Sequence, residues 1–431
     1  MLDIKFIRDN AEAVQNNASN KGYKVDISAL LKLDIDRREL SGKVDELRQK
    51  RNEIVAQTNG GRPTDELIAE GKLVKDQLFD IEPRLKDIDV SFTTMLKQVP
   101  NMAMSDVPVG LTEDENVVIK TVGEIPKFEF TPRSHADIAI ERGWLDKERA
   151  AKVSGSRFAY LKGDLVRLTR AMVDYAMDVL SDELILKKIA SDAGLNVSTK
   201  PFTPVLPPLL IKTETYDAMD RLEPRDDRYK IEGEELWLQG SAEHVLGSMH
   251  SNEIIAEDDL PIRYAGFATS FRKEAGTYGK DMEGIFRMHQ FDKLEMESLT
   301  TSDNGLNEHL FLIAIQEYIM ASLELPYRVI QKCTFDIGKP NARGVDIDVW
   351  LPGQDKYRET HTADYMTDYQ ARRLQTKVRR NSGDIELIYT NDATGLSQRP
   401  LIAIIENGQT IDGKVRIPAV LRPYLGGRET L

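Results

Sequence analysis

The chain has 431 residues, of which 41% are hydrophobic and 30% are charged, so it is long and apolar enough to bury a sizeable core. Its formal net charge of -13 excludes a uniformly basic nucleic-acid coat, because phosphate binding depends on Lys and Arg; any such contact must be a local basic patch. The single cysteine, Cys333, excludes an intramolecular disulfide and a cysteine-rich zinc site, so no zinc is expected.

The first residues of the chain, 1–8, alternate charged and apolar side chains and lack the apolar core of a signal peptide. No uninterrupted apolar run approaches the roughly 20 residues that span a bilayer. We therefore expect a cytoplasmic protein that does not contact a membrane.

Residues 27–99 carry the apolar periodicity of two long helices. Apolar side chains recur at spacings of three, four and seven, which is typical of the seam of a coiled coil. The seam positions are Leu33, Leu40, Val44, Leu47 and Ile54 in the first helix, and Val74, Leu78, Ile81, Leu85, Ile88, Phe92 and Met95 in the second. Helix-breaking residues at 59–65 separate them, and Thr64 or Asp65 can cap the second helix. The pattern predicts an antiparallel hairpin about 45 Å long, at 1.5 Å for each of about 30 residues, with a kink at Pro83.

The outer face of the first predicted helix is rich in basic residues, with acidic ones interleaved. The basic residues are Arg37, Arg38, Lys43, Arg48, Lys50 and Arg51. Two interpretations of this pattern are equally good: an ordinary charged helix surface, or a stripe that contacts phosphates. The sequence leaves both open.

A proline-punctuated linker at residues 99–110, followed by an acidic loop at 111–116, predicts a domain boundary. We expect one domain over residues 1–105 and a second over 106–431. Residues 128–192 are mostly helical in pattern. Later runs of alternating hydrophobicity predict strands at 235–239, 264–271, 291–296, 327–331, 345–351, 356–362 and 385–389. Regular helices do not separate these strands, so the expected fold class is α+β, with an antiparallel sheet flanked by helices.

Common nucleotide-binding motifs are absent from the sequence. There is no G-x-x-x-x-G-K-[ST] and no strand-linked G-x-G-x-x-G, and the six histidines have no tight metal-binding spacing. If the protein binds ATP, arginines and Mg²⁺ must hold the phosphates in place of a glycine-rich loop.

Residues 269–276 and 286–295 predict a strand, a glycine-containing loop and a second strand. We expect Arg272 and Glu274 on one strand, and Phe291 and Glu295 on the other. A charged hairpin with one aromatic core residue would also fit this pattern. The segment nevertheless closely resembles motif 2 of class II aminoacyl-tRNA synthetases in its seryl form, F-R-x-E-A-G … H-Q-F-x-K-x-E.

The resemblance to bacterial-type seryl-tRNA synthetases covers nearly the whole chain. Residues 1–10 resemble the family's N-terminus, and residues 148–158 and 161–164 resemble the start of its catalytic domain. The pair Pro207-Pro208 resembles motif 1, which lies at the dimer interface of this class. Residues 370–373 and 399–407 resemble its last core segment and motif 3.

The resemblance implies a role for each matching residue. Arg272 and Arg399 would be catalytic, through contacts to the α-phosphate and γ-phosphate of ATP. The implied ATP-binding residues are Arg272, Glu274, Met288, Phe291, Glu359, Thr362 and Arg399, of which Glu359 and Thr362 would bind Mg²⁺. The implied serine-binding residues are Ser241, Glu243, Arg272, Glu295 and Thr394.

Three segments depart from the family's pattern. Ser241 replaces the usual threonine but keeps the hydroxyl group. Residues 359–365 read E-T-H-T-A-D-Y where E-I-S-S-C-S-N is usual. Residues 391–395 stand where the family has a serine or threonine that contacts the substrate hydroxyl. Counting back from Arg399 without a gap places Ala393 at that position, whereas a shift of one residue places Thr394 there. We select Thr394.

The function implied by the resemblance is ATP-dependent activation of L-serine to seryl-adenylate, followed by transfer to the 3′ end of tRNA(Ser), and also of tRNA(Sec), by a homodimer. A catalytically silent RNA-binding paralogue is a second hypothesis, but Arg272, Glu295, Glu359 and Arg399 are all retained. A third hypothesis, a seryl ligase that charges a carrier protein, does not account for the arm at residues 27–99.

Overall fold

The computed structural model describes residues 1–57, 63–274 and 284–431. The predicted breaker residues 59–62 and the glycine-containing loop at 275–283 therefore lie outside the described residues. The chain divides into two compact units, Met1–Met102 and Ala103–Leu431. Within the described ranges, no helix combines the length and hydropathy that crossing a membrane requires.

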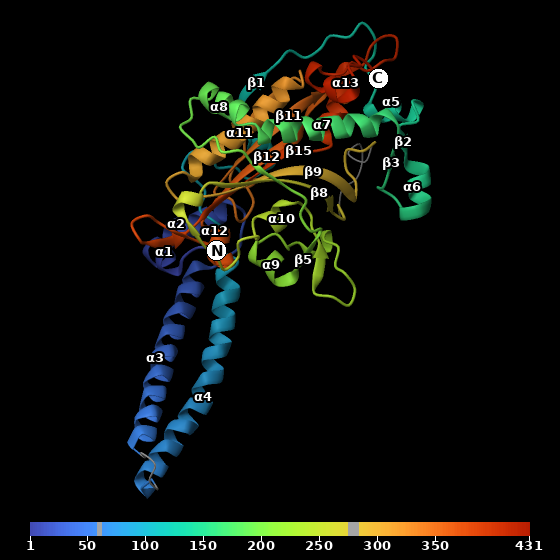
Figure 1. Ribbon diagram of the computed structural model, residues 1–431. Helices are drawn as coiled ribbons and strands as arrows, with labels where there is room; N and C mark the ends of the chain where they lie inside the picture. The colour runs from blue at the N-terminus through green and yellow to red at the C-terminus, as the bar shows by residue number, and fades with distance from the viewer. Residues whose placement is uncertain (58–62, 275–283) are drawn as a thin grey trace. The chain divides into compact units, whose positions relative to one another are not determined.

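The first unit is helical and contains the predicted arm. Its helices are α1 (Ile4–Asp9), α2 (Ala11–Asn20), α3 (Ile27–Gln57) and α4 (Asp65–Leu96). The two long helices, α3 and α4, pack side by side as a hairpin (Figure 1). Thr64 caps α4, because its side chain accepts a hydrogen bond of 3.3 Å from the Leu67 amide. Helix α4 is continuous through Pro83.

The apolar seam holds the hairpin together. Val44 and Ile54 of α3 are buried against Val74 and Leu78 of α4, with further apolar residues around them. Helices of this length owe their stability chiefly to such packing and not to propensity. The seam spacing therefore predicts the arm correctly.

The second unit is built on an eight-stranded sheet in the order β1-β10-β11-β12-β15-β9-β8-β4. Every neighbouring pair is antiparallel except β4 and β8. In that order the strands are Val117–Val122, Tyr327–Gln331, Arg343–Leu351, Lys356–Thr367, Tyr389–Leu396, Gln290–Thr300, Ile262–Phe271 and Thr203–Val205. The predicted α+β fold with an antiparallel sheet is confirmed.

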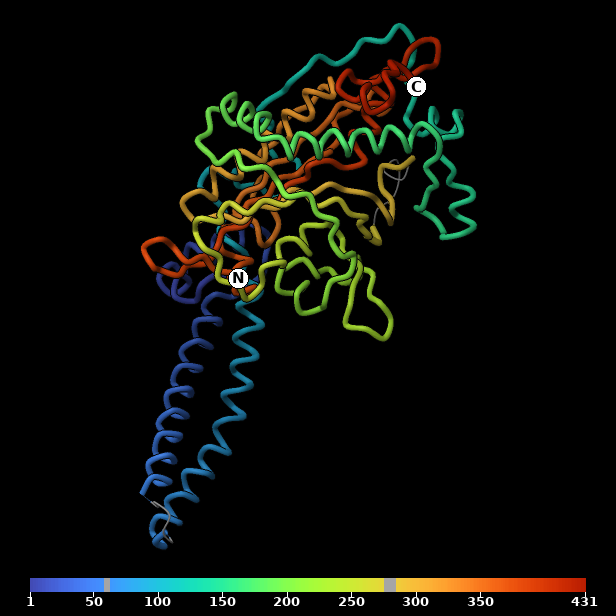
Figure 2. Tube along the Cα trace, in the orientation of Figure 1, coloured from blue at the N-terminus to red at the C-terminus, as the bar shows by residue number. Residues whose placement is uncertain are grey.

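Helices and short strands complete the second unit, whose path Figure 2 traces from cyan to red. The helices are α5 (His135–Glu141), α6 (Lys147–Ser154), α7 (Asp164–Ser181), α8 (Glu183–Asp192), α9 (Thr213–Ala218), α10 (Glu243–Leu246), α11 (Gly305–Ser322), α12 (Tyr369–Leu374) and α13 (Arg399–Gly408). The remaining strands are β2 (Leu145–Asp146), β3 (Tyr160–Leu161), β5 (Leu210–Lys212), β6 (Leu236–Leu238), β7 (Ile254–Ala256), β13 (Lys377–Arg379) and β14 (Ile385–Leu387). Side chains from α7, α8, α11 and α13 share one apolar core with the sheet.

Several details differ from the sequence prediction, which also omitted the short strands β2, β3, β4, β5, β7 and β13. The alternation did not predict β1, whose side chains are almost all exposed. The single strand predicted at 385–389 is two strands in different sheets, β14 and the start of β15, and the pattern of hydrophobicity does not mark the break between them at Ile388. Arg272 and Glu274 are not on a strand, because β8 ends at Phe271 and Glu274 has a φ of 49°, which no strand residue adopts.

Candidate active site

The centre of the sheet carries a row of buried polar side chains. Side chains alternate along a strand, so Lys293, Glu295 and Glu297 of β9 share one face, while Leu294 and Met296 enter the apolar core. On the neighbouring strand β15, the register places Asp392 opposite Glu297 and Thr394 opposite Glu295. Burying so many ionisable groups on one face is costly unless they are paired or bind a charged ligand.

One cavity opens beside this row and gathers the residues that the sequence assigns to ATP. All seven line it: Arg272, Glu274, Met288, Phe291, Glu359, Thr362 and Arg399. They come from the ends of β8 and β9, from β12 and from the start of α13, so only the folded chain brings them together. Lys293 and Thr394 also line this cavity.

Arg272 is held at the cavity by its backbone and its side chain. Its amide donates to the His289 carbonyl over 3.0 Å, and its Nε donates to the Gly240 carbonyl over 2.9 Å. The guanidinium carbon lies 5.3 Å from the centroid of the Phe291 ring. This arrangement fixes a permanent positive charge beside an aromatic face, which suits an anion next to a flat base.

Glu274 follows at the edge of the cavity. Its Oε2 accepts a hydrogen bond of 3.0 Å from Arg287 Nη1, and sequence analysis did not assign a role to that arginine. The carboxylate is therefore held in place by a neighbour in the same hairpin.

Arg399 and Glu359 form the opposite side of the cavity. Arg399 Nη1 lies 3.1 Å from Glu359 Oε2 and also donates to the Glu359 carbonyl over 2.8 Å. Desolvation would raise the pKa of Glu359, but the charges of Arg399 and Lys332 outweigh it and lower that pKa to about 2. The guanidinium carbon of Arg399 is 4.9 Å from the centroid of Phe286, a ring that the sequence analysis also missed.

A bulge in β12 brings Glu359 and Thr362 to the same cavity. Asp348 pairs with Glu359 and Ile347 pairs with His361, so Thr360 is an extra residue on β12. In a regular strand, without this extra residue, Glu359 and Thr362 would face opposite sides of the sheet. The Thr362 hydroxyl is buried next to the Asp346 carboxyl, because the two residues pair across β12 and β11. Carboxylate and hydroxyl oxygens side by side are a hard-oxygen donor set that fits Mg²⁺.

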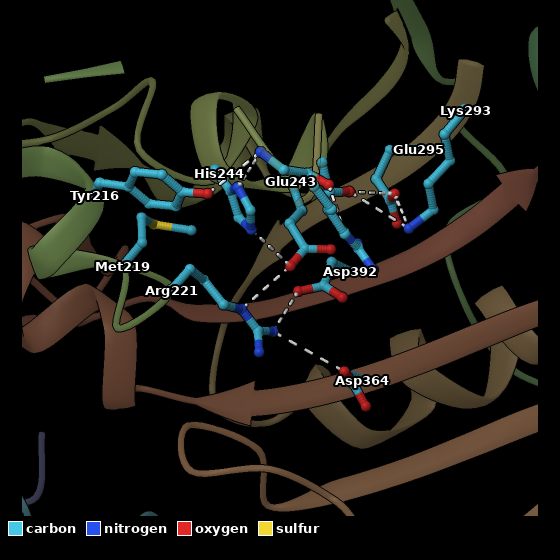
Figure 3. Close-up of polar contacts among 12 residues, drawn as sticks. Tyr216, Met219, Arg221, Glu243, His244, Lys293, Glu295, Asp364 and Asp392 are labelled. Carbon is cyan, nitrogen blue, oxygen red and sulfur yellow. Dashed lines mark hydrogen bonds and ion pairs between the residues drawn. The ribbon is translucent and has the colours of Figure 1, made fainter. Parts of the chain in front are cut away.

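The residues assigned to serine do not form a single lining. Thr394 reaches the cavity, whereas Ser241, Glu243 and Glu295 are buried directly behind it. Ser241 Oγ donates to Glu295 Oε2 over 2.9 Å, and Lys293 forms an ion pair with the same carboxylate (Figure 3). Burial raises the pKa of Glu295, although the Lys293 charge opposes that rise.

Arg221 joins the other carboxylates behind the cavity. Its Nε lies 3.1 Å from Glu243 Oε1, and its Nη2 lies 3.3 Å from Asp392 Oδ2 and 3.9 Å from Asp364 Oδ2 (Figure 3). Burial would raise the pKa of Glu243, but the Arg221 charge outweighs it and holds that pKa well below its usual range. No sequence motif marked Arg221, which follows α9 and reaches these strands only through the tertiary fold.

The two alternatives for the substrate hydroxyl contact face opposite sides of β15. Ala393 pairs with Ala363 of β12 and lies in the apolar core, while Thr394 lines the cavity. Asn391, two residues before Ala393, also points away, and its Nδ2 donates to the Gly305 carbonyl over 3.2 Å. The register thus places Asp392 and Thr394 on the cavity side.

The unusual segment at residues 361–365 is mostly interior. His361 is buried, and its Nδ1 lies 2.9 Å from Thr360 Oγ1. Burial lowers the pKa of His361 to about 3, so its ring is neutral at pH 7. Tyr365 is also buried and stacks against His309, with ring centroids 5.9 Å apart. Of the three unusual residues, only Asp364 faces the charged cluster, through Arg221.

Most of the basic residues assigned to the outer face of α3 are paired within the arm. Arg38 Nε lies 3.2 Å from Asp34, Arg48 Nη2 lies 2.9 Å from Glu82, and Lys50 Nζ lies 2.9 Å from Glu70. Arg37 lies 3.7 Å from Asp34 and over the Phe92 ring. Lys43 and Arg51 are exposed. The face is therefore less positive than its count of basic residues suggests.

Comparison with protein families matches both units of the chain. Residues 1–103 match the seryl-tRNA synthetase N-terminal domain. Residues 228–408 match the tRNA synthetase class II core domain of the G, H, P, S and T enzymes.

Individual proteins match over the whole length. The serine–tRNA ligase of Deinococcus radiodurans is 39% identical, with 100% of this chain and 99% of the relative covered. That of Bacillus subtilis is 38% identical, with 100% of each covered. The crystal structure of seryl-tRNA synthetase from Pyrococcus horikoshii complexed with ATP has a TM-score of 0.88 and 36% identity, covering 100% of this chain and 99% of that one.

Proposed function

The chain belongs to the seryl-tRNA synthetase family, and from this premise we propose how its residues activate serine and charge tRNA. In the first step, a serine carboxylate oxygen attacks the α-phosphorus of ATP, and pyrophosphate leaves. In the second, a terminal ribose hydroxyl of tRNA(Ser), the 3′-OH in this class, attacks the carbonyl carbon of seryl-adenylate, and AMP leaves. The full-length matches give no support to a carrier-protein ligase or a silent paralogue.

The observation that carries the mechanism is that Arg272 and Arg399 line one cavity with Glu359 and Thr362. Two anions must meet in the first step, so the protein has chiefly to orient them and neutralise their repulsion. Arg272 binds the α-phosphate and the serine carboxylate, because its fork of N–H groups can bridge two anions. Arg399 binds the γ-phosphate from the other side.

The adenine base lies between aromatic and cationic groups. Phe291 stacks on one face and Arg399 on the other, while Met288 packs alongside and Glu274 accepts from the exocyclic amino group. The fixed position of the Glu274 carboxylate beside Arg287 supports this assignment.

Mg²⁺ is the metal that fits Glu359 and Thr362. When bound, it neutralises phosphate charge and supplies no redox or covalent chemistry. The low pKa of Glu359 supports the assignment, because its carboxylate is ionised at neutral pH, and Thr362 lines the same cavity.

The serine pocket consists of Ser241, Glu243, Glu295 and Thr394. Serine is small, so size excludes larger amino acids, whereas alanine and glycine have to be rejected through the missing hydroxyl. A buried site that needs this hydroxyl for its own hydrogen bonds can reject such analogues by about 10⁴–10⁵. The position of Thr394 opposite Glu295 supports a contact to the serine hydroxyl.

The two units have separate roles in this proposal. Residues 1–105 bind tRNA through the arm, and residues 106–431 form the catalytic domain. The exposed residues Lys43 and Arg51 are the basic side chains of α3 best suited to phosphate contacts. The enzyme is a homodimer, with the segment around Pro207-Pro208 at the interface.

The test is ATP–pyrophosphate exchange with serine, threonine, alanine and glycine in turn. We expect exchange that depends on Mg²⁺ and strongly prefers serine. Absence of exchange with serine would contradict the proposed activity, and equal exchange with alanine would contradict the assigned pocket.

A further inference from the structure

A buried histidine and a buried glutamate link three segments of the second unit behind the wall of the cavity assigned to ATP. His135 is the first residue of α5 and is 1% exposed, and Glu406 of α13 is 0% exposed. The two helices pack against each other (Figure 1). Neither side chain has a role assigned from the sequence. Burying such a pair is costly unless its hydrogen bonds are made, so we asked what each polar atom holds.

The Glu406 carboxylate holds the histidine and a turn of the sheet. Its Oε1 accepts a hydrogen bond of 3.0 Å from the His135 amide and lies 2.8 Å from His135 Nδ1. Its Oε2 accepts from the Gly353 amide over 2.9 Å, in the turn between β11 and β12. A Cβ on Gly353 would lie only 2.8 Å from Ser134 Cα, so the turn approaches α5 this closely because it has no side chain there.

The other ring nitrogen of His135 holds the backbone at Ile285. The Ile285 amide donates to His135 Nε2 over 3.4 Å. A backbone amide can only donate, so Nε2 is the acceptor, and the ring proton lies on Nδ1 and is donated to Glu406. Gly284 packs against the same ring, since a Cβ built on it would overlap Nε2. One rigid ring thus accepts at one end and donates at the other.

The backbone that His135 holds lines the cavity. Ile285 and Phe286 are both among the lining residues. They belong to residues 284–289, which precede β9 and lie outside the strands, so a strand ladder does not fix them. The guanidinium carbons of Arg358 and Arg399 lie 4.1 Å and 4.9 Å from the centroid of the Phe286 ring. The place of this ring therefore determines where Arg399 rests.

We infer that His135 is a positioning residue for ATP: it ties the Ile285 backbone to Glu406 and so fixes Phe286 against Arg399. The inference rests on the proposed function, which assigns Arg399 to the γ-phosphate and the adenine base. His135 does not itself line the cavity. Arg399 begins α13 and Glu406 lies near its end, so the link joins this helix and residues 284–289 into one wall.

The first experiment compares two substitutions that keep opposite halves of the link. The amide of His135→Asn stands at the level of Nδ1, so it can donate to Glu406 but cannot reach Ile285. The amide oxygen of His135→Gln reaches the level of Nε2 and can accept from Ile285. In pyrophosphate exchange, the KM for ATP should rise about tenfold in His135→Asn and less than about threefold in His135→Gln, because a loosened wall misplaces Arg399. The KM for serine should stay within about twofold of wild type in both. Equal effects of the two substitutions on ATP, or a matching rise in the KM for serine, would overturn the inference.

Gln409 provides a matched structural control. Its Oε1 accepts from the Arg133 amide over 2.9 Å, and its Nε2 donates to the Arg133 carbonyl over 3.1 Å. It therefore joins the segment before α5 to the end of α13, as His135 does, but it does not line the cavity. Gln409→Leu should lower Tm and leave the KM for ATP within about twofold of wild type. A rise equal to that of His135→Asn would mean that any weakening of this packing loosens the site, and the inference would fail.

A double-mutant cycle tests the path through Phe286. If His135 acts by fixing this ring, His135→Asn should add less than about twofold to the KM for ATP once Phe286→Leu is present. Full additivity would refute the path. If His135→Asn does not fold, His135→Gln carries the test alone, because it should bind ATP almost as wild type does despite losing the bond to Glu406. A tenfold rise in its KM for ATP would then overturn the inference.

Isothermal titration with ATP separates this inference from the proposed function. If wild type binds ATP but shows no serine-dependent exchange, the proposed function fails, and the Kd for ATP still tests the link, with an increase of about tenfold expected in His135→Asn. If wild type catalyses exchange and His135→Asn has the same KM and Kd for ATP, the inference alone fails.

Discussion

Thr394 lies directly opposite Glu295 across the antiparallel pair β15 and β9, and both residues are buried. The neighbouring residue, Ala393, pairs with Ala363 on the other side and packs into the apolar core. A shift of one residue in this register would exchange the hydroxyl for a methyl group at the cavity. In the proposed serine pocket, the choice of serine over alanine would therefore depend on the pairing of these two strands.

Thr394→Ala should lower the preference for serine over alanine about tenfold or more, because the site loses a partner for the substrate hydroxyl. The measurement is the ratio of kcat/KM for the two amino acids in pyrophosphate exchange. Thr394→Ser keeps the hydroxyl and should keep the ratio. Ala393→Ser should lower Tm by placing a hydroxyl in the core, yet leave the ratio unchanged. The reverse pattern would assign the contact to Ala393.

Arg272→Ala should abolish serine-dependent pyrophosphate exchange, with a loss of about 10²–10³ or more in kcat, because the α-phosphate loses its bidentate partner. Arg272→Lys keeps the charge without the fork and should retain a small part of the activity. Circular dichroism and Tm should match wild type for both variants. Normal exchange by the alanine variant would refute the assignment of residues 269–295 to this role.

Shortening the arm should separate activation from tRNA charging. Arg48 and Glu82 form an ion pair of 2.9 Å, so residues 49–81 can be replaced by a short glycine-containing turn without separating the helices. We expect pyrophosphate exchange to stay within about twofold of wild type and aminoacylation of tRNA(Ser) to fall at least about tenfold, since phosphate contacts contribute much of RNA affinity. Unchanged charging would refute the proposed role of the arm.

A narrower change tests the basic face of α3. The variant Lys43→Gln/Arg51→Gln should weaken tRNA binding. It should also reduce the slope of log K against log salt concentration by about one for each charge removed. Arg48→Gln/Lys50→Gln removes the same charge from residues that are paired with Glu82 and Glu70, so it is the matched control and should have the smaller effect. Filter binding at several salt concentrations measures both.

Glu359→Gln should raise the Mg²⁺ concentration needed for half-maximal exchange about tenfold or more, because an amide is a weaker ligand than a carboxylate for a hard cation. The KM for serine should change little, since Glu359 is not one of the residues assigned to serine. A variant with the Mg²⁺ dependence of wild type would show that Glu359 does not bind the metal.

The buried pair of Arg263 and Glu308 should contribute strongly to stability. Arg263 Nη2 donates to Glu308 Oε2 over 2.9 Å, and both side chains are almost fully buried. Glu308→Ala leaves an unpaired buried charge, so it should cost about 3–5 kcal/mol and lower Tm. Arg263→Met/Glu308→Leu should recover most of that loss. A single variant as stable as wild type would contradict this account.

The sequence predicted the regular parts of the molecule well because their signals are local. Heptad spacing gives the seam of the arm, with Val44 and Leu78 buried in it as expected. The alternation of apolar and polar residues predicts β8, β9, β10, β11 and β12, and the predicted ends differ from the observed ones by a few residues. It missed β1, because an exposed strand does not require an apolar face.

The sequence by itself determined the arm, the sheet class and, through motif resemblance, the residues that gather at the cavity assigned to ATP. Only the tertiary structure decided which side of β15 faces that cavity, and therefore separated Thr394 from Ala393. It also brought Arg221, which no motif marks, onto Glu243 and Asp392. The physical reason is that strand register and long-range ion pairs depend on packing between segments far apart in the chain, whereas helix periodicity and motifs are properties of neighbouring residues.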